Sequence, residues 1–486
     1  MSKPDYVKKE WMVPISKNAH KAGGIREMIS ISLPMVVALA CDTLMIFTDR
    51  VFLSRLGSEI MNAALGGGLT CFMMATLFTG LVGYSTALVA QYLGAGKKEF
   101  CSKVLTQSIF IIVAGYPVII LARPLAYMMF ELMEIAPQQL APQKIYFDIM
   151  IFGTVIGLLR TAFSSFFSGI GQTRVVMVAA CVSMVTNIVL NYILIYGKLG
   201  FPAMGITGAA YGTIIGGCVG LCILVTTYLK KKNRCEFAIG RSMRFAGDVF
   251  YKLVRYGYPA GLEMFLNVFA FNFLIMIFQS HSPITATAAS IMFNWDMVSF
   301  VPLIGIEIGV TSLVGRAMGS GKPELADLSV ISGLKLGLIY SAIILILFVG
   351  LPHFLVGLFK PVTGDLDLFT EAFPLAVFMI RTASFYVMAN AVIIVFIGAL
   401  RGAGDTIWSM GLTVGLHLIM ATSGFLMLRV LGSSPEDAWI VLTIVFILAS
   451  FAVYARYRSE KWKNIKMIGH EPSLQRPDYF HEPAEM

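Results

Sequence analysis

The chain contains 486 residues, of which 57% are hydrophobic and 13% are charged, and its formal net charge is +9. Soluble domains carry about 25% charged residues, so this sequence has too little polar surface to coat a water-soluble globule. The composition argues against a soluble enzyme, a disordered chain and a secreted disulfide module. The class that the composition favours is a polytopic helical membrane protein. Its spans are expected to be helical because a backbone in lipid must satisfy its own hydrogen bonds.

Apolar segments long enough to cross a bilayer, about 20 residues each, recur along the chain. The predicted helices span residues 30–56, 64–92, 105–130, 144–168, 175–196, 207–229, 257–280, 286–315, 328–359, 368–399, 407–430 and 438–456. The first 28 residues are polar and basic and lack the apolar core of a signal peptide, so the first span is expected to be retained. The sequence therefore predicts an all-α membrane protein with twelve transmembrane helices.

Basic residues gather in three polar regions, which are the N-terminal segment 1–28, the linker 230–256 and the tail 457–486. Twelve spans place these regions on one side of the membrane, and the positive-inside rule assigns that side to the cytoplasm. The net charge is therefore a consequence of membrane topology, and no nucleic-acid partner is expected.

An internal repeat divides the spans into two lobes of six helices, residues 29–229 and 257–456. The pairs that carry the repeat are Pro34 with Pro259, Gly94–Glu99 with Gly319–Glu324 and, at a larger offset, Gly169–Thr173 with Gly402–Thr406. Because each lobe has an even number of spans, both enter the membrane in the same direction. They should be related by a pseudo-two-fold axis along the membrane normal, with a pathway where they meet.

The two glycine-rich turns of this repeat contain a lysine but do not form a nucleotide-binding loop. The motif GxxxxGK[ST] needs a first glycine, where this chain has Gln91 or Arg316, and a hydroxyl residue after the lysine, where it has Lys98 or Pro323. We interpret both as tight cytoplasmic turns. No separate domain that could hydrolyse ATP is evident, so active transport would draw on an ion gradient.

Charged residues inside the predicted spans are few, and each costs about 2.5–3.5 kcal/mol at the bilayer centre. In the first span, Asp42 and Asp49 lie seven residues apart and nearly on one helix face. Two such carboxylates could hold a sodium ion or exchange protons. Asn187 and Asn191 in the fifth span and Thr213 in the sixth offer neutral oxygen ligands. Two plainer interpretations stay open: Asp49 pairs locally with its neighbour, and the asparagines join helices.

The second half carries Glu263 in the seventh span, Asp296 and Glu307 in the eighth and Arg381 in the tenth. Asp296 and Glu307 are eleven residues apart, which places them on one helix face. A buried carboxylate–arginine pair is the structural interpretation, and a substrate or ion site is the functional one. The residues themselves leave both open.

The ordered motifs of this chain resemble those of the multidrug and toxic compound extrusion (MATE) family, over roughly residues 26–456. The segments that carry the resemblance are Pro34 with Asp49–Gly57, Gln91–Lys97, Gly169–Arg174, Asn187–Asn191, Gly205–Thr213 and Gly398–Thr406. The resemblance implies a cation-coupled antiporter of the inner (plasma) membrane with two lobes around a central cavity. Such a protein exports organic, often cationic, amphipathic compounds in exchange for sodium ions or protons.

The family also implies site residues and partners. Asp49 matches the first-helix carboxylate that is assigned to cation or proton coupling, which makes it the expected sodium ligand. Asn187 and Thr213 match other polar members of that cluster, and Asn191 stands where some members have an aspartate. The expected partners are organic cations or drugs, the coupling ion and the lipid bilayer. The protein is expected to be a monomer with cytoplasmic termini, without enzymatic activity and without a cofactor.

The C-terminal lobe departs from the family pattern. Asn267 and Asn390 stand where NorM-type members carry a glutamate and an aspartate, so a NorM-type sodium site in this lobe is not expected. We therefore hypothesise that coupling is centred on Asp49, with Asp42 supplying further charge. The alternative function is a flippase for a lipid-linked sugar or similar amphiphile, which the scarcity of arginine inside the membrane, Arg160 and Arg381, disfavours.

Overall fold

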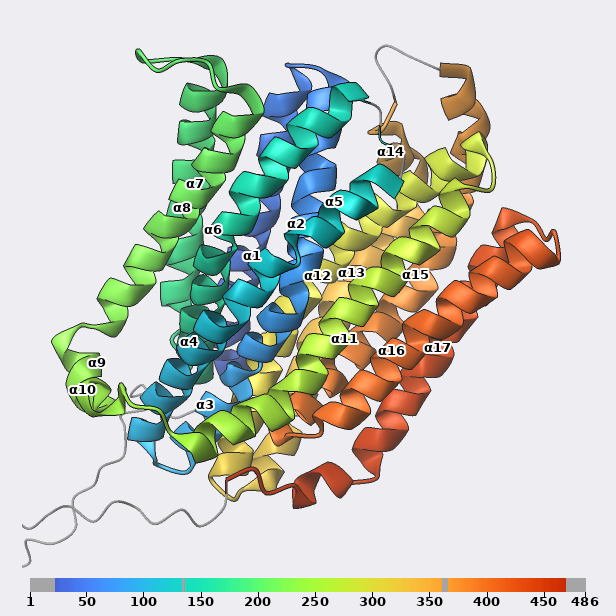
Figure 1. The fold of residues 1–486 in the computed structure, drawn as a ribbon. Helices are drawn as coiled ribbons and strands as arrows, with labels where there is room; N and C mark the ends of the chain where they lie inside the picture. The colour runs from blue at the N-terminus through green and yellow to red at the C-terminus, as the bar shows by residue number, and fades with distance from the viewer. Residues whose placement is uncertain (1–21, 133–134, 136, 361–365, 469–486) are drawn as a thin grey trace, which may run out of the picture.

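The structure is a computed structural model that describes residues 22–132, 135, 137–360 and 366–468. Within these residues it contains helices and no strands, and twelve spans are long and apolar enough to cross a membrane. The predicted all-α fold with twelve transmembrane spans is confirmed. Figure 1 shows the blue-to-green helices of the first half beside the yellow-to-red helices of the second.

The first half, here called the N-lobe, contains six spans built from eight helices. These are α1 (Ile25–Ser54), α2 (Ser58–Gly83), α3 (Ser85–Gly94), α4 (Lys98–Leu121), α5 (Arg123–Leu132), α6 (Pro137–Gly169), α7 (Thr173–Tyr196) and α8 (Gly205–Tyr228). One span joins α2 with α3, and another joins α4 with α5. The linker to the second half forms two short helices, α9 (Lys231–Glu236) and α10 (Ile239–Ser242).

The second half, here called the C-lobe, also contains six spans. Its elements are α11 (Gly247–Gln279), α12 (Pro283–Gly319), α13 (Pro323–Gly350), α14 (Pro352–Gly357), α15 (Leu366–Ala403), α16 (Thr406–Phe425), the π-helical turn η1 (Leu426–Val430) and α17 (Pro435–Arg458). A final 3₁₀ turn, η2, spans Lys461–Asn464. The helix α11 begins at Gly247, well before the predicted start at 257, because its first turns are polar and extend beyond the apolar stretch.

Local sequence explains where two of the C-lobe helices begin. The side chains of Ser282 and Ser434 accept a hydrogen bond from the backbone N–H three residues later, each at 3.1 Å, at the starts of α12 and α17. A proline follows each serine as the first helical residue. Both features are favoured there, because the first turn of a helix has backbone N–H groups without intrahelical partners.

Each lobe has its own apolar core, in which aromatic rings pack edge to face. In the N-lobe the ring centroids of Phe166 and Tyr228 lie 5.1 Å apart. In the C-lobe those of Phe278 and Trp439 lie 5.7 Å apart, and the Trp439 indole N–H donates to the Met379 carbonyl at 3.0 Å. Such pairs contribute beyond the area that they bury. The two cores also share residues across the lobe boundary, because Met28 of α1 belongs to the C-lobe core and Leu253 of α11 to the N-lobe core.

The lobe interface follows the internal repeat. A Cβ atom on Gly94 would clash with the carbonyl oxygen of Arg316, and a Cβ atom on Gly319 would clash with that of Gln91. The repeat that pairs Gly94 with Gly319 also pairs Gln91 with Arg316, so these two close approaches are equivalent. This reciprocity is what a pseudo-two-fold axis between the lobes predicts.

Several polar contacts between the lobes lie at one end of the molecule. Arg316 of α12 forms an ion pair with Glu27 of α1, and the Ser312 hydroxyl donates to the Ser168 carbonyl at 2.8 Å. The described chain begins and ends at this same end, where α9 and α10 also lie (Figure 1). We call it the terminal side. The lobes are closed against each other there.

Gly319→Ala is expected to destabilise the folded protein by about 1–3 kcal/mol, the usual cost of overpacking. The reason is that the new methyl group would meet backbone atoms of α3, which cannot turn away as a flexible side chain could. The measurement is the midpoint of thermal unfolding of the detergent-solubilised protein. Gly411→Ala is the matched control, because no atom lies within 4 Å of its Cβ position. Equal midpoints for the two variants would contradict the close interface.

Candidate functional site

Four of the predicted polar residues meet inside the N-lobe. Asp49 lies on α1, Asn187 and Asn191 on α7, and Thr213 on α8. The Asn191 amide donates to one carboxylate oxygen of Asp49, and the Thr213 hydroxyl donates to the other at 3.1 Å. The Asn187 amide donates to the Thr213 hydroxyl at 3.2 Å. We call these four residues the N-lobe cluster.

The N-lobe cluster is buried in an apolar lobe. Asp49 is 8% exposed, and both asparagines are fully buried. A carboxylate in such a place is costly unless polar groups surround it. Gly212 of α8 makes room for the Asn191 side chain, because a Cβ atom at this position would clash with it. That glycine was not singled out from the sequence, although it lies inside the Gly205–Thr213 motif.

The N-lobe cluster offers oxygen atoms of the kind that bind small hard cations. Besides the Asp49 carboxylate it contains the Asn191 side-chain oxygen, which is buried and has no hydrogen-bond partner in the described structure. The same carboxylate could instead take up a proton. Across the described residues, no three His, Cys, Asp or Glu side chains gather as a metal site would require.

Asp42 lies outside the N-lobe cluster. Its carboxylate oxygens lie 2.7 and 3.0 Å from one guanidinium nitrogen of Arg160 on α6. Both side chains are partly exposed. The shared helix face with Asp49 therefore does not bring the two carboxylates into one site in this conformation. A role for Asp42 in ion coupling stays a prediction.

The C-lobe holds a second buried cluster, formed by Glu263 of α11, Glu307 of α12, Arg401 of α15 and Thr413 of α16. Arg401 forms ion pairs with Glu263, at 2.8 Å, and with Glu307. The Thr413 hydroxyl donates to Glu263 at 2.6 Å. Glu263 is 1% exposed and Glu307 is also buried. We call these four residues the C-lobe cluster.

The C-lobe cluster carries its own counter-ion. One guanidinium group contacts two carboxylates, so the group as a whole has one formal negative charge when both glutamates are ionised. The second oxygen of Glu263 and the Nε of Arg401 have no hydrogen-bond partner among the described residues. This differs from the N-lobe cluster, in which neutral groups alone donate to Asp49.

The sequence predicts Arg381 as the arginine of a C-lobe site, and the structure brings Arg401 to this position instead. Arg381 is exposed, whereas Arg401 lies in the last turn of α15. Arg401 lies inside the Gly398–Thr406 motif, but the predicted membrane span ended before it, at residue 399. Arg401 was therefore not named among the charged residues inside the predicted spans.

The remaining predicted C-lobe residues lie apart from one another. Asp296 accepts a hydrogen bond from the Tyr386 hydroxyl at 2.8 Å, so it and Glu307 have different partners although both are on α12. Asn390 is buried on α15. Asn267 on α11 is half-buried, and its side-chain oxygen has no partner among the described residues. Their participation in transport stays a prediction.

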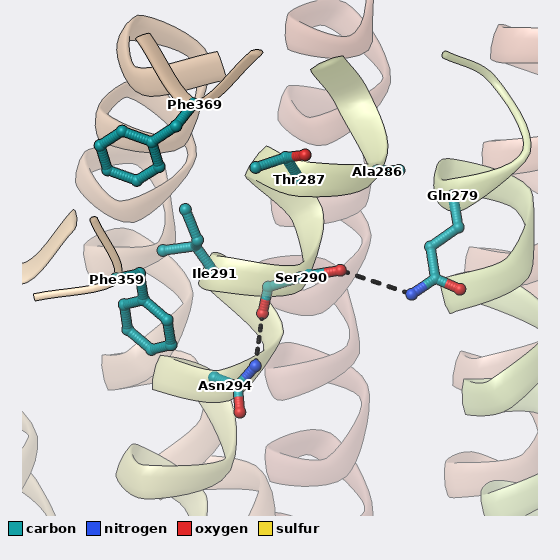
Figure 2. Close-up of a pocket in the computed structure, with 8 residues that line it drawn as sticks. All are labelled: Gln279, Ala286, Thr287, Ser290, Ile291, Asn294, Phe359 and Phe369. Atoms are coloured by element: carbon teal, nitrogen blue, oxygen red, sulfur yellow. Dashed lines mark hydrogen bonds between the residues drawn. The ribbon is translucent and has the colours of Figure 1, made fainter. Parts of the chain in front are cut away.

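A pocket of about 380 Å³ lies at the other end of the C-lobe, away from the terminal side. Figure 2 shows its lining, with the rings of Phe359 and Phe369 beside Ile291 on one side and the hydrogen-bonded Gln279 and Ser290 on the other. The lining residues are Gln279, Ala286, Thr287, Ser290, Ile291, Asn294, Phe359 and Phe369. Mixed linings of this kind are common in small-molecule sites, but none of the predicted site residues contributes to this one.

Comparisons with known proteins place the chain in a family. The sequence matches the MatE family over residues 34–193 and 259–425. It is 25% identical to the probable multidrug resistance protein NorM of Thermotoga maritima, over 92% of this chain and 95% of that protein. It is also 25% identical to the multidrug resistance protein PmpM of Pseudomonas aeruginosa, over 84% of this chain and 86% of that one.

The fold is similar to that of solved transporters. A MOP superfamily transporter from Pyrococcus furiosus superposes with a TM-score of 0.81 at 21% identity, covering 91% of this chain and 97% of that one. A multidrug resistance MATE family transporter in an outward-facing conformation gives a TM-score of 0.81 at 19% identity, with the same coverage. The family match, the twelve spans and the shared fold agree, and the chain belongs to the MATE family of membrane transporters.

Proposed function

We propose that this MATE transporter is a secondary active efflux antiporter. It exports organic, often cationic, amphipathic compounds in exchange for sodium ions or protons, by alternating access between two lobes of one chain. The names of its relatives, which are multidrug resistance proteins, support efflux of drugs. The basic linker and ends of the chain support a cytoplasmic location for the terminal side. The N-lobe cluster supports an ion-coupled mechanism.

One observation carries the assignment of the coupling site. Asp42, Glu263 and Glu307 are each paired with an arginine. Asp49, by contrast, forms no ion pair within the described residues, and its hydrogen-bond donors are an amide and a hydroxyl. A buried carboxylate that lacks a counter-ion is stabilised by a proton or a small cation. Asp296 also has only a hydroxyl partner, but it is half-buried. Among the described residues Asp49 is therefore the buried carboxylate without an ion pair, and its charge is the one that such an ion would neutralise.

The helix α1 connects this carboxylate to the lobe interface. Asp49 lies near one end of α1, and Glu27, which is paired with Arg316 of the C-lobe, lies near the other. Ser32 and Val36, between them, face Gly309 and Gly305 of α12. A change in the position of α1 on ion binding would thus reach the contacts that close the terminal side. In this proposal, ion binding and lobe opening are coupled through one helix, α1.

The C-lobe cluster has a different role in the proposal. Arg401 already neutralises part of the charge of Glu263 and Glu307, so this site does not need a transported cation to be stable. Asn267 and Asn390 add no charge to it. We infer that the C-lobe cluster holds α11, α12 and α15 together, and that coupling is centred on the N-lobe.

Transport in proteoliposomes tests the proposal. The purified protein is reconstituted, and a fluorescent organic cation is followed while a sodium gradient or a proton gradient is imposed separately. Uptake or release should follow one of the two gradients and stop when an ionophore dissipates it. Transport that responds to neither gradient would overturn the antiporter. In that case flipping of a fluorescent lipid-linked sugar analogue in the same vesicles would favour the flippase.

A further inference from the structure

The chain does not end with the last membrane helix. After α17 it turns at Glu460, which has a left-handed backbone with φ +55°, forms η2 and continues to residue 468 along the terminal side. Trp462 is fully buried and Met467 is 2% exposed. The sequence predicted a polar tail for this region, and these two apolar residues instead lie inside the protein. We call residues 461–468 the strap.

The strap is attached to the C-lobe at its start. The ring of Trp462 stacks on Tyr457 of α17 with centroids 5.3 Å apart, and its indole N–H donates to the Tyr457 carbonyl at 2.9 Å. Lys463 forms an ion pair with Asp327 of α13 at 2.8 Å, and the Tyr457 hydroxyl donates to the same carboxylate at 2.6 Å. These contacts hold the strap against α13 and α17.

The ion pair of Lys463 persists at neutral pH. Burial acts to lower the pKa of Lys463, but its hydrogen bonds to Asp327 and Glu460 outweigh that effect and raise its pKa above the usual value. The lysine therefore stays charged at neutral pH.

The other end of the strap lies between the lobes. The sulfur of Met467 is 3.3 Å from the Tyr84 hydroxyl and 3.2 Å from the Gln91 amide, both of the N-lobe. The same hydroxyl lies 3.3 Å from the Arg401 carbonyl oxygen, and the same amide donates to the Gly402 carbonyl at 2.9 Å. Met467 therefore sits where α3 of the N-lobe, with Tyr84 just before it, meets the end of α15.

Both lobes enclose this methionine. On the C-lobe side, a Cβ atom on Gly404 would clash with the Met467 side chain, so the glycine makes room for it. On the N-lobe side it contacts Tyr84 and Gln91, and Ile465 and Ile468 pack against the apolar cluster that contains Tyr84 and Met467. Separation of the lobes at the terminal side would break the contacts of Met467 with one lobe or the other.

We propose that the strap is a latch on the terminal-side gate of the transporter, with Met467 as the residue that must withdraw before the lobes can part there. This inference rests on the proposed alternating access. Trp462 and Lys463 keep the latch attached to the C-lobe, while Met467 engages the N-lobe. A thioether suits this role, because methionine is flexible and fills irregular gaps. The buried contacts of Met467 favour the closed arrangement over the open one.

Distances between the lobes test the latch in the full-length protein. Spin labels are attached through non-canonical amino acids at Arg174 of the N-lobe and Glu324 of the C-lobe, which are both exposed at the terminal side. Pulsed electron paramagnetic resonance then gives the distance distribution in lipid nanodiscs. The wild type should populate mainly the short distance. Met467→Ala should raise the ratio of long to short distances by about tenfold, as expected when a buried side chain is truncated.

Two variants serve as controls. Met467→Leu keeps the buried volume and should resemble the wild type, and Lys466→Ala changes the exposed neighbour and should do the same. Lys463→Ala weakens the attachment without removing Met467, so it should shift the distribution in the same direction as Met467→Ala. It provides a second test if the alanine variant at 467 folds poorly.

The outcomes separate this inference from the proposed function. Wild-type distributions for both Met467→Ala and Lys463→Ala, in proteins that still transport the fluorescent cation, would overturn the latch and leave the antiporter intact. Wild-type protein that fails to transport under either gradient would overturn the proposed function, whatever the distances show. If Lys466→Ala shifts the distance distribution as much as Met467→Ala does, the latch is also contradicted. The shift would then be a general effect of substitutions in the strap rather than of the loss of Met467.

Discussion

Asp49→Asn is expected to lower gradient-driven export by about 5- to 150-fold, the range that corresponds to usual coupling free energies between two binding sites. The amide has nearly the same shape as the carboxylate and can still accept from Asn191 and donate to the Thr213 hydroxyl. It can neither take up a proton nor contribute charge to a cation site. The measurement is export of a fluorescent organic cation from proteoliposomes with and without the gradient.

Glu59→Gln is the matched control for this prediction. Glu59 is an exposed carboxylate in the first turn of α2, so its loss removes the same charge without touching the N-lobe cluster. We expect near wild-type export for it. If Asp49→Asn and Glu59→Gln retain equal gradient-driven export, coupling does not depend on Asp49.

Arg401→Met is expected to destabilise the folded protein by about 3–5 kcal/mol, the usual cost of removing one partner of a buried ion pair. Two buried glutamates, Glu263 and Glu307, would lose their shared cation. Thermal unfolding of the detergent-solubilised protein measures the effect. Arg381→Met is the matched control, since that arginine is exposed, and its midpoint should lie close to that of the wild type.

A triple variant separates structure from coupling in the C-lobe. Arg401→Met combined with Glu263→Gln and Glu307→Gln removes the cation and both anions together. Its stability should recover part of the loss, because no uncompensated charge remains buried. If coupling is centred on Asp49, the triple variant should keep gradient-driven export. A stable triple variant without such export would show that the C-lobe carboxylates take part in coupling.

The general architecture could be predicted from the sequence because lipid imposes strong rules on composition. The low charge content and the length of the apolar segments predicted twelve helices, and the repeat predicted two lobes. The N-lobe cluster could also be predicted from the sequence, since Asn187 and Asn191 are one helical turn apart and lie in recognisable motifs. Which residues share a helix face depends only on their spacing along the chain, so it can be predicted from a single sequence.

Contacts between distant helices were harder to predict. The sequence does not show that Asp42 lies against Arg160, or that Glu263 and Glu307 share Arg401, because these pairs depend on how helices pack. Arg401 was missed for a further reason. The apolar stretch ends near residue 399, but α15 continues to Ala403, since its last turn is covered by the other lobe rather than exposed to water.

The internal repeat does not extend to the two buried polar clusters. It pairs Asp49 with Leu274, at the offset that pairs Pro34 with Pro259, and it pairs Asn187 with Met420, at the later offset. The backbone of the two lobes is thus repeated, while their buried polar groups are not. The N-lobe cluster has a carboxylate without a counter-ion, and the C-lobe cluster has its own arginine. This asymmetry is the physical basis for assigning coupling to one lobe.

Ion flux that accompanies substrate transport tests the central claim most directly. In proteoliposomes without an imposed gradient, a concentration gradient of the organic cation should drive sodium ions or protons in the opposite direction through the wild-type protein. The same substrate gradient should drive no ion flux through Asp49→Asn. Equal ion fluxes through the wild type and Asp49→Asn would contradict the assignment of Asp49 as the coupling residue.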